Sequence, residues 1–281
     1  IQALLARAQE NFPVASLLFP AHARKPLLHF YAFARHSDNI ADAAEIPPDE
    51  KQAQLTLLDA ALANRPLDAP LPEWFRPYLA DTQSGISPPA YGRDLLKAFL
   101  QDASQQRYAD WDALLAYCNH SAVPVGRQVL ELCAEKQADL TAADALCIVL
   151  QLLNHLQDCK ADYEALNRIY LPQTLFKTHE AKEADLRNPH ATPALQRLFS
   201  DYLDRCEALL DTASPLPTSI KSRRLRWELT LTLELARALL YRLRRNDPLS
   251  GPVRVPRFLW PVYLLKAGLH TWLPPQTSPK P

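Results

Sequence analysis

The stretch ADALCIVLQLLNHLQDCKAD, residues 143–162, decides the fold class of this chain. Its apolar residues surround almost the whole circumference of a helix, which is typical of a helix buried in a bundle. Four polar residues interrupt the apolar pattern at helical spacing, namely Gln151, Asn154, Asp158 and Asp162. At 100° per residue they fall within an arc of about 80°. We therefore predict a core helix that carries one narrow polar stripe.

A second stretch, LLHFYAFARHSDNIADAAE at residues 27–45, repeats this design nearer the start of the chain. Tyr31, Arg35, Asp38 and Asp42 fall within an arc of about 60° on a helix that is otherwise rich in Leu, Phe and Ala. Each predicted helix therefore carries a pair of aspartates four residues apart.

The composition of the whole chain predicts an all-α fold. The 281 residues include 50 Leu and 40 Ala, but only 8 Val, 7 Ile and 5 Gly. Leu and Ala favour helices, and the β-branched residues that favour strands are scarce. No glycine-rich nucleotide loop is present. We predict a single-domain helical bundle over residues 1–281 with a Pro-rich wrap or tail at 248–281.

Prolines and caps predict where the helices begin and end. Thr141 and Asp144 have the spacing of a capping box at the start of the second striped helix. The apolar stretch 258–273 is interpreted as a docked helix rather than a membrane contact, and the basic run 221–230 as a solvated helix face. The predicted helices span about 26–44, 48–63, 74–80, 90–106, 111–134 with an interruption at Pro124, 141–166, 193–213 and 219–245.

Charge and cysteine content narrow the class of protein further. The chain has 31 basic and 31 acidic residues, which argues against nucleic acid as a partner. The five cysteines are odd in number and form no C-x-x-C, and no signal-peptide pattern opens the sequence. We therefore expect the protein to reside in the reducing environment of the cytoplasm, with its cysteines as free thiols. No run of 18 apolar residues predicts a membrane span.

The two striped helices together predict a site for a charged ligand. Four carboxylates that face one another repel strongly, and buried carboxylates are costly unless they are paired or bind a metal. Mg²⁺ takes oxygen ligands and typically bridges a few carboxylates to phosphates. Arg35 lies one turn before Asp38 and is placed to contact phosphate oxygens. We therefore predict a diphosphate clamp inside a bundle, the alternative being two ordinary solvated helix faces.

Four motifs that carry these stripes and their neighbours resemble the squalene and phytoene synthase family. They are YAFARHSDNIAD at 31–42, YCNHSAVPVG at 117–126, QLLNHLQDCKAD at 151–162 and RIYLP at 168–172. The resemblance covers about residues 11–245, which would form the core of the domain, and implies a bundle of the isoprenoid synthase type with a central apolar cavity. ENFPVAS at 10–16 and SAVPVGR at 121–127 most resemble the bacterial hydroxysqualene synthase branch of hopanoid biosynthesis.

The resemblance implies roles for individual residues of this chain. Asp38, Asp42, Asp158 and Asp162 would hold Mg²⁺ with help from Asn154. Tyr117 would face the reacting carbons, as one of the catalytic residues together with the four aspartates. The residues that the resemblance implies for substrate binding are Phe12, Ser16, Tyr31, Arg35, Gln151, Asn154, Arg168 and Tyr170.

The implied reaction is the Mg²⁺-assisted ionisation of presqualene diphosphate, a C30 prenyl diphosphate, followed by rearrangement and quenching by water. Aromatic faces such as those of Phe33 or Tyr117 would stabilise the carbocation. Two alternatives stay open: head-to-head condensation of two farnesyl diphosphates, and a non-catalytic lipid-binding or assembly protein on the same scaffold. Since a C30 substrate prefers membrane to water, we also expect a peripheral encounter with the inner face of a bacterial cell membrane.

Overall fold

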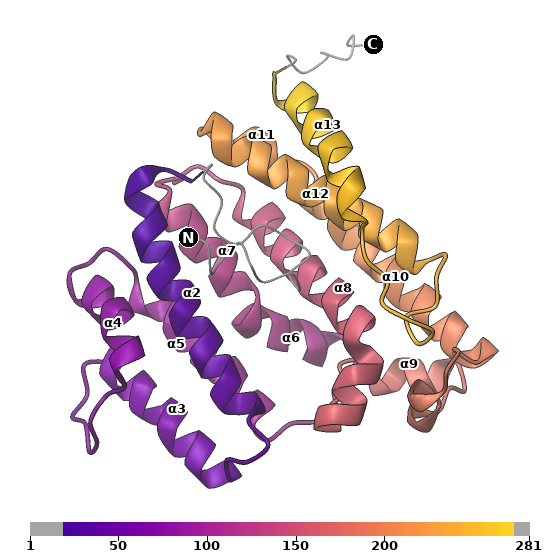
Figure 1. Ribbon diagram of the computed structural model, residues 1–281, viewed down its shortest axis with the longest axis horizontal. Coiled ribbons are helices and arrows are strands. Elements are labelled where there is room, and N and C mark those ends of the chain that lie inside the picture. Colours follow the sequence, from indigo (N-terminus) through magenta and orange to yellow (C-terminus); the bar gives the residue numbers. More distant parts are fainter. Residues whose placement is uncertain (1–18, 273–281) are drawn as a thin grey trace.

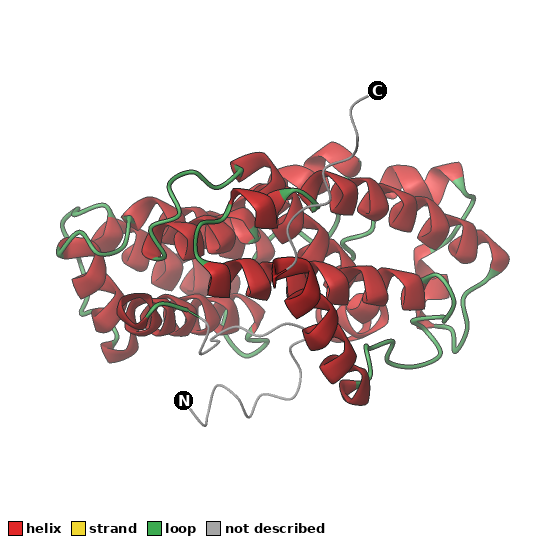
Figure 2. Ribbon diagram, turned by 90° about the horizontal axis from the view of Figure 1, so that it is seen from above, coloured by secondary structure: helices red, strands yellow, loops and turns green. Residues whose placement is uncertain are grey.

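The computed structural model describes residues 19–272 of the chain, and these residues confirm the all-α prediction (Figures 1 and 2). Within them, the only β-type pairing is an isolated bridge between Arg107 and Ile169. Short 3-10 turns cover Glu73–Phe75, Glu183–Arg187 and Arg257–Leu259. The α-helices are α2 (Ala21–Asp42), α3 (Pro48–Leu62), α4 (Arg76–Gln83), α5 (Pro89–Asp102), α6 (Trp111–Ser121), α7 (Val123–Leu132), α8 (Leu140–Leu166), α9 (Gln173–Thr178), α10 (Pro193–Ala213), α11 (Leu216–Ser219), α12 (Arg223–Leu243) and α13 (Trp260–Trp272).

Two hydrophobic cores hold the striped helices in place. The first lies under α2 and joins it to α3, α4 and α5 through side chains such as Phe33, Tyr78 and Leu96. The second surrounds α8, which packs against α7, α10 and α12. Figure 1 shows α2 and α8 descending in the same direction, with α7 between them, so that their C-terminal ends lie at the same end of the molecule. This shared direction brings the two pairs of aspartates to one end.

The start of α8 corrects the predicted cap. The N-cap is Asp139, whose carboxylate accepts a hydrogen bond of 3.1 Å from the backbone N–H of Ala142. Thr141 already lies inside the helix, and Asp144 instead receives two hydrogen bonds from Arg127. The predicted capping box was therefore wrong, because an aspartate two residues earlier satisfies the free N–H group first.

Other helix starts also differ from the prediction. α2 begins at Ala21 and includes Pro26, which lacks one backbone donor but has its ring buried in the packed face of the helix. The helix predicted to begin at Ser219 begins instead at Arg223, as α12, with Ser222 as its N-cap. Ser219 is the last residue of the short helix α11. The interruption predicted near Pro124 is confirmed, since Ala122 separates α6 from α7.

The C-terminal region consists of an irregular segment followed by the helix α13. Residues 248–256 pass over α8, where the side-chain amide of Gln157 donates to the carbonyl of Val253. α13 then packs along α12, and the indole of Trp227 donates to the carbonyl of Leu264 at 3.2 Å. The docked-helix prediction for 258–273 is confirmed over α13, because Pro261 falls in the first turn, where proline is tolerated. None of the described helices is both long and apolar enough to cross a membrane.

Candidate active site

A cavity of about 610 Å³ lies between α2 and α8, with further walls from α5, α6 and α7. Its lining changes character along the helix axes. The early turns of α2 contribute Leu27 and Phe30, whereas its last turns contribute Asp38 and Asp42. Apolar lining continues on the other helices with Leu95, Phe99, Val125 and Val129. The cavity therefore has an apolar body and one acidic end, a shape that suits a long apolar molecule with a charged head.

Most of the predicted site residues line this one cavity. Those that do are Tyr31, Arg35, Asp38, Asp42, Tyr117, Gln151, Asn154, Asp158, Asp162, Arg168 and Tyr170. Phe12 and Ser16 lie outside the described residues. The structure thus brings together residues from four separate motifs, although only two of those motifs were interpreted from their spacing alone.

The prediction for Phe33 was wrong. Its side chain is fully buried in the core under α2, where it stacks on Tyr78 with ring centroids 4.6 Å apart. Phe33 lies two residues from Tyr31, which corresponds to the far side of the helix from the stripe. Phe30 and Tyr31 are the aromatic residues of α2 that line the cavity.

The aspartates at the acidic end repel one another, and nearby arginines compensate their charge only in part. Burial and the neighbouring charge of Asp42 raise the pKa of Asp38 to about 6. Burial and the charge of Asp158 raise the pKa of Asp162 to about 7, against the opposing effect of Arg168. Burial also raises the pKa of Asp158, and the positive charge of Arg254 opposes this shift. A set of carboxylates held close together in this way attracts cations.

The acidic end is open rather than buried in the helical core. Among the described residues, Asp158 is exposed and the other three aspartates are half-buried at the cavity wall. No group of three acidic, histidine or cysteine side chains in this part of the chain converges closely enough to hold a metal by itself. The prediction that both stripes are buried was therefore only partly right. The stripes face inward, but they line a cavity instead of packing against other side chains.

This donor set fits magnesium. Mg²⁺ prefers oxygen ligands, keeps several of its waters, and is usually held by one or two carboxylates together with substrate phosphates. Carboxylate pairs with raised pKa values on two cavity walls supply oxygen ligands of this kind. The residues available to hold the ion are the four aspartates and Asn154.

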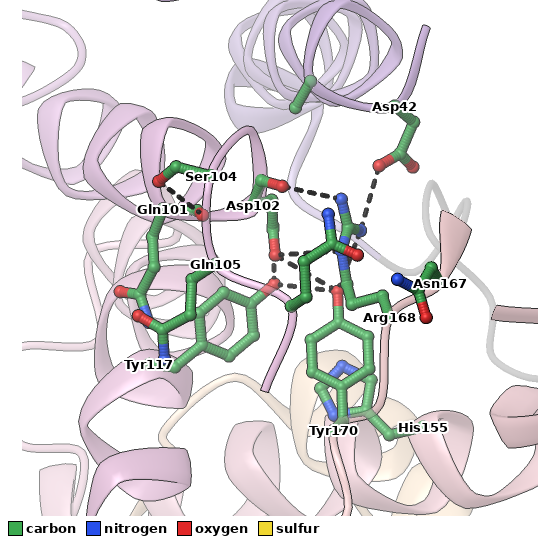
Figure 3. Close-up of polar contacts among 12 residues, drawn as sticks. Asp42, Gln101, Asp102, Ser104, Gln105, Tyr117, His155, Asn167, Arg168 and Tyr170 are labelled. Atoms are coloured by element: carbon green, nitrogen blue, oxygen red, sulfur yellow. Dashed lines mark hydrogen bonds and ion pairs between the residues drawn. The ribbon is translucent and has the colours of Figure 1, made fainter. Parts of the chain in front are cut away.

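Arg168 joins the two sides of the acidic end (Figure 3). Its guanidinium donates to the carboxylate of Asp42 at 3.0 Å, to the backbone carbonyl of Asp102 at 2.9 Å and to the hydroxyl of Tyr170 at 3.2 Å. The residue is only 5% exposed. Such an arginine is held in one orientation, because three acceptors on different elements use its planar donor array.

A left-handed turn after α8 places Arg168 there. Asn167 has a φ of 50°, a conformation that asparagine adopts more readily than most residues. The extended segment that follows is tied to the loop after α5, since the backbone N–H of Ile169 donates to the carbonyl of Gln106 at 3.0 Å. Arg107 reinforces this junction by donating to the carbonyl of Asn167 and to Glu183. The turn sends the chain back toward the aspartates.

Asp102, at the end of α5, is a site residue that the sequence analysis missed. It is 5% exposed and lines the cavity. Its carboxylate accepts hydrogen bonds from the hydroxyls of Tyr117, at 2.7 Å, and Tyr170, at 3.2 Å. Burial raises its pKa to about 7, while Arg168 and the two tyrosines oppose that shift. No helical repeat of polar residues marks Asp102 in the sequence, because it is the last residue of α5 and the helix has no further turn to continue such a repeat.

His155 supports the same cluster as a neutral group. Its ring stacks on Tyr170 with centroids 3.6 Å apart and an interplanar angle of 4°, and it shares a hydrogen bond of 2.9 Å with Gln151. Burial, and then the charge of Arg168, lowers its pKa to about 3. The histidine therefore fixes the Tyr170 ring without adding a second positive charge.

Replacing Asp102 by Asn is expected to lower kcat/KM by about 10- to 100-fold, because the carboxylate that orients Tyr117, Tyr170 and Arg168 is lost while its shape is kept. Steady-state kinetics across the pH range measures this. Asp81→Asn is the matched control, since Asp81 is similarly buried, hydrogen-bonded to His29 and outside the cavity. Equal losses in both variants, or an unchanged pH profile in Asp102→Asn, would show a purely structural role.

An all-helical bundle that encloses an apolar cavity with one acidic end defines an isoprenoid synthase fold. The model of the squalene/phytoene synthase family matches residues 5–259, and the chain belongs to this family of enzymes. It is 40% identical to a hydroxysqualene synthase of Rhodopseudomonas palustris, over 88% of this chain and 83% of that protein. It is 36% identical to a hydroxysqualene synthase of Sinorhizobium fredii, over 93% and 87% respectively.

A solved structure agrees with this assignment. A squalene synthase from Alicyclobacillus acidocaldarius superposes with a TM-score of 0.70 at 31% identity, covering 87% of this chain and 91% of that one. The fold and family predicted from the sequence motifs are confirmed.

Proposed function

We propose that this protein is a hydroxysqualene synthase, which converts presqualene diphosphate and water into hydroxysqualene and diphosphate. The observation that carries the proposal is the polarity of the cavity, with an apolar body and an acidic end between α2 and α8. The similarity to two hydroxysqualene synthases over most of their lengths supports water as the second reactant.

The acidic end would receive the diphosphate. The Mg²⁺ held by Asp38, Asp42, Asp158, Asp162 and Asn154 would supply charge neutralisation for the departing diphosphate. Arg168 is fixed beside Asp42 and can donate to diphosphate oxygens as negative charge develops on them. Arg35, which is exposed and donates to Asp38 at 3.0 Å, can turn from that carboxylate to the same oxygens.

The reaction begins when the C–O bond of the substrate breaks and its electron pair leaves with diphosphate. The cation that remains lies among apolar and aromatic walls, where Phe30 and Phe99 exclude water and present ring faces. The hydroxyl of Tyr117 is engaged by Asp102, so its ring is held in one place at the border between the two ends. After rearrangement a water oxygen bonds to one carbon, and its proton leaves with the released diphosphate.

A non-catalytic role on the same scaffold is disfavoured by the mutual repulsion of the carboxylates. Carboxylates with raised pKa values destabilise the folded state at neutral pH, and a protein without a ligand for them gains nothing from that cost. Head-to-head condensation remains the nearest chemical rival, since it uses the same acidic end.

Product analysis in water enriched in the heavy oxygen isotope separates these reactions. With presqualene diphosphate and Mg²⁺, we expect a C30 alcohol that carries oxygen from the solvent, without any requirement for a nicotinamide cofactor. The control is Asp158→Asn, which should form no product. Conversion of farnesyl diphosphate alone to a C30 product, or release of a hydrocarbon, would contradict the proposal.

A further inference from the structure

The outward face of α13 and of the turn before it is apolar. Phe258, Val262, Leu265 and Leu269 are 79%, 59%, 67% and 53% exposed. The spacings of Val262, Leu265 and Leu269 place them along one side of the helix, and Phe258 lies in the turn before it. These four residues, called here the α13 stripe, account for nearly half of the large hydrophobic residues that are exposed within residues 19–272.

The opposite side of α13 is already used. Ala267 is fully buried against Leu231 and Leu235 of α12, and the nitrogen of Lys266 forms an ion pair with Glu234 at 2.5 Å. A surface helix normally turns polar residues outward, whereas α13 is apolar on its docked side and on its free side. A contiguous apolar patch of this kind marks an interaction surface.

The sequence stretches next to the α13 stripe carry an excess of basic residues, and the acidic Glu234 of α12 pairs with one of them, Lys266. Residues 248–272 contain three basic residues and no acidic one, and residues 221–226 contain four basic residues and no acidic one. This imbalance occurs in a chain whose basic and acidic residues are equal in number. The two stretches are neighbours in space. Trp227, one residue after the basic run, donates to the backbone carbonyl of Leu264, and its indole lies beside Gly268.

We propose that the α13 stripe docks this protein on the surface of a bilayer that carries anionic headgroups. The four apolar side chains would enter the interface, while exposed basic residues such as Lys221 and Arg224 would lie among the headgroups. From Phe258 to Leu269 a helix extends about 16 Å, far less than the roughly 30 Å of a hydrocarbon core, so the contact is interfacial. A second copy of the chain fits less well, since symmetric pairing would bring the same basic residues together.

Flotation of the full chain with lipid vesicles tests the proposal. We expect binding to phosphatidylcholine vesicles that contain phosphatidylglycerol, and a loss of about tenfold or more in bound fraction for the double variant Leu265→Gln/Leu269→Gln. Leu140→Gln is the matched control, because Leu140 is 50% exposed at the start of α8. All three proteins should have the same melting temperature and the same turnover in detergent, which shows that binding, and not folding or catalysis, has changed.

Charge dependence forms the second arm of the experiment. Lys221→Gln/Arg224→Gln should weaken binding to the anionic vesicles by about tenfold, and half-molar salt should do the same for the unchanged protein. Equal binding to vesicles of pure phosphatidylcholine, or no vesicle binding at all, would overturn the proposal. A dimer in sedimentation velocity that Leu265→Gln/Leu269→Gln disperses, without vesicle binding, would assign the stripe to self-association and would also overturn it.

Discussion

Replacing Asp162 by Asn is expected to reduce turnover by at least about a thousandfold while making the folded protein more stable. Asp162 lies on the α8 wall of the cavity, where burial and Asp158 raise its pKa to about 7. Asn keeps the shape but removes a charge that repels its neighbours. We expect the free energy of unfolding to rise by about 1 kcal/mol at pH 8.

The pH dependence of this stabilisation has a definite sign. A carboxyl group whose pKa is raised from 3.8 to about 7 binds its proton more tightly in the folded state. It therefore favours folding at low pH and loses that contribution as pH rises through 7. The stability difference between Asp162→Asn and the unchanged protein should be largest at pH 8 and vanish near pH 4.

Denaturant unfolding at several pH values, together with Mg²⁺ titration, measures both effects. Protons compete with the metal for the carboxylates, so the apparent affinity for Mg²⁺ in the presence of diphosphate should fall as the pH drops below 7. Asp144→Asn is the control, since Asp144 lies on the same helix and pairs with Arg127 away from the aspartate pairs. Full activity of Asp162→Asn would remove this residue from the proposed metal site.

Replacing Arg168 by Lys is expected to lower kcat/KM by about 100- to 1000-fold with little loss of stability. Lysine keeps the positive charge that compensates Asp42 and Asp102, but it cannot present a planar set of donors to both of them and to Tyr170. The alanine variant is less informative, because it leaves the buried Asp102 without its cation and is expected to cost about 3–5 kcal/mol of stability.

The control for this variant is Arg127→Lys. Arg127 also pairs with an aspartate through two donors, at 3.0 and 2.7 Å to Asp144, but on the outer side of the bundle. Steady-state kinetics and thermal unfolding of both variants separate the effect of an arginine at the acidic end from that of any lost bidentate pair. Similar kcat/KM values for the two variants would contradict the role proposed for Arg168.

Much of the acidic end could be predicted from local sequence. Asp38 and Asp42, like Asp158 and Asp162, follow the helical repeat, and periodicity alone places each pair on one side of its helix. Arg168 and Tyr170 came only from family resemblance, since they lie in a loop where no repeat applies. Asp102 had neither signal, because its importance comes from contacts with residues 15 and 68 positions away.

The errors have a similar origin. Thr141 was predicted as a cap from a pattern that Asp139 satisfies first. The region after Pro248 was predicted as a wrap or tail that includes a docked helix at 258–273, without the contacts that hold this helix. Its helical part, α13, is stabilised by contacts with Trp227, Leu231 and Leu235, which lie far away in the sequence. Local propensity cannot register contacts of that kind.

The sequence by itself determined the helical class, the two pairs of aspartates and the faces on which they lie, because helix periodicity is a property of neighbouring residues. Only the tertiary structure decided that α2 and α8 run in the same direction, that their acidic ends meet at Arg168 and Asp102, and that one side of α13 has no protein partner within the described residues. These features depend on how helices pack, and packing is set by the shapes and burial of side chains that the chain brings together from distant positions.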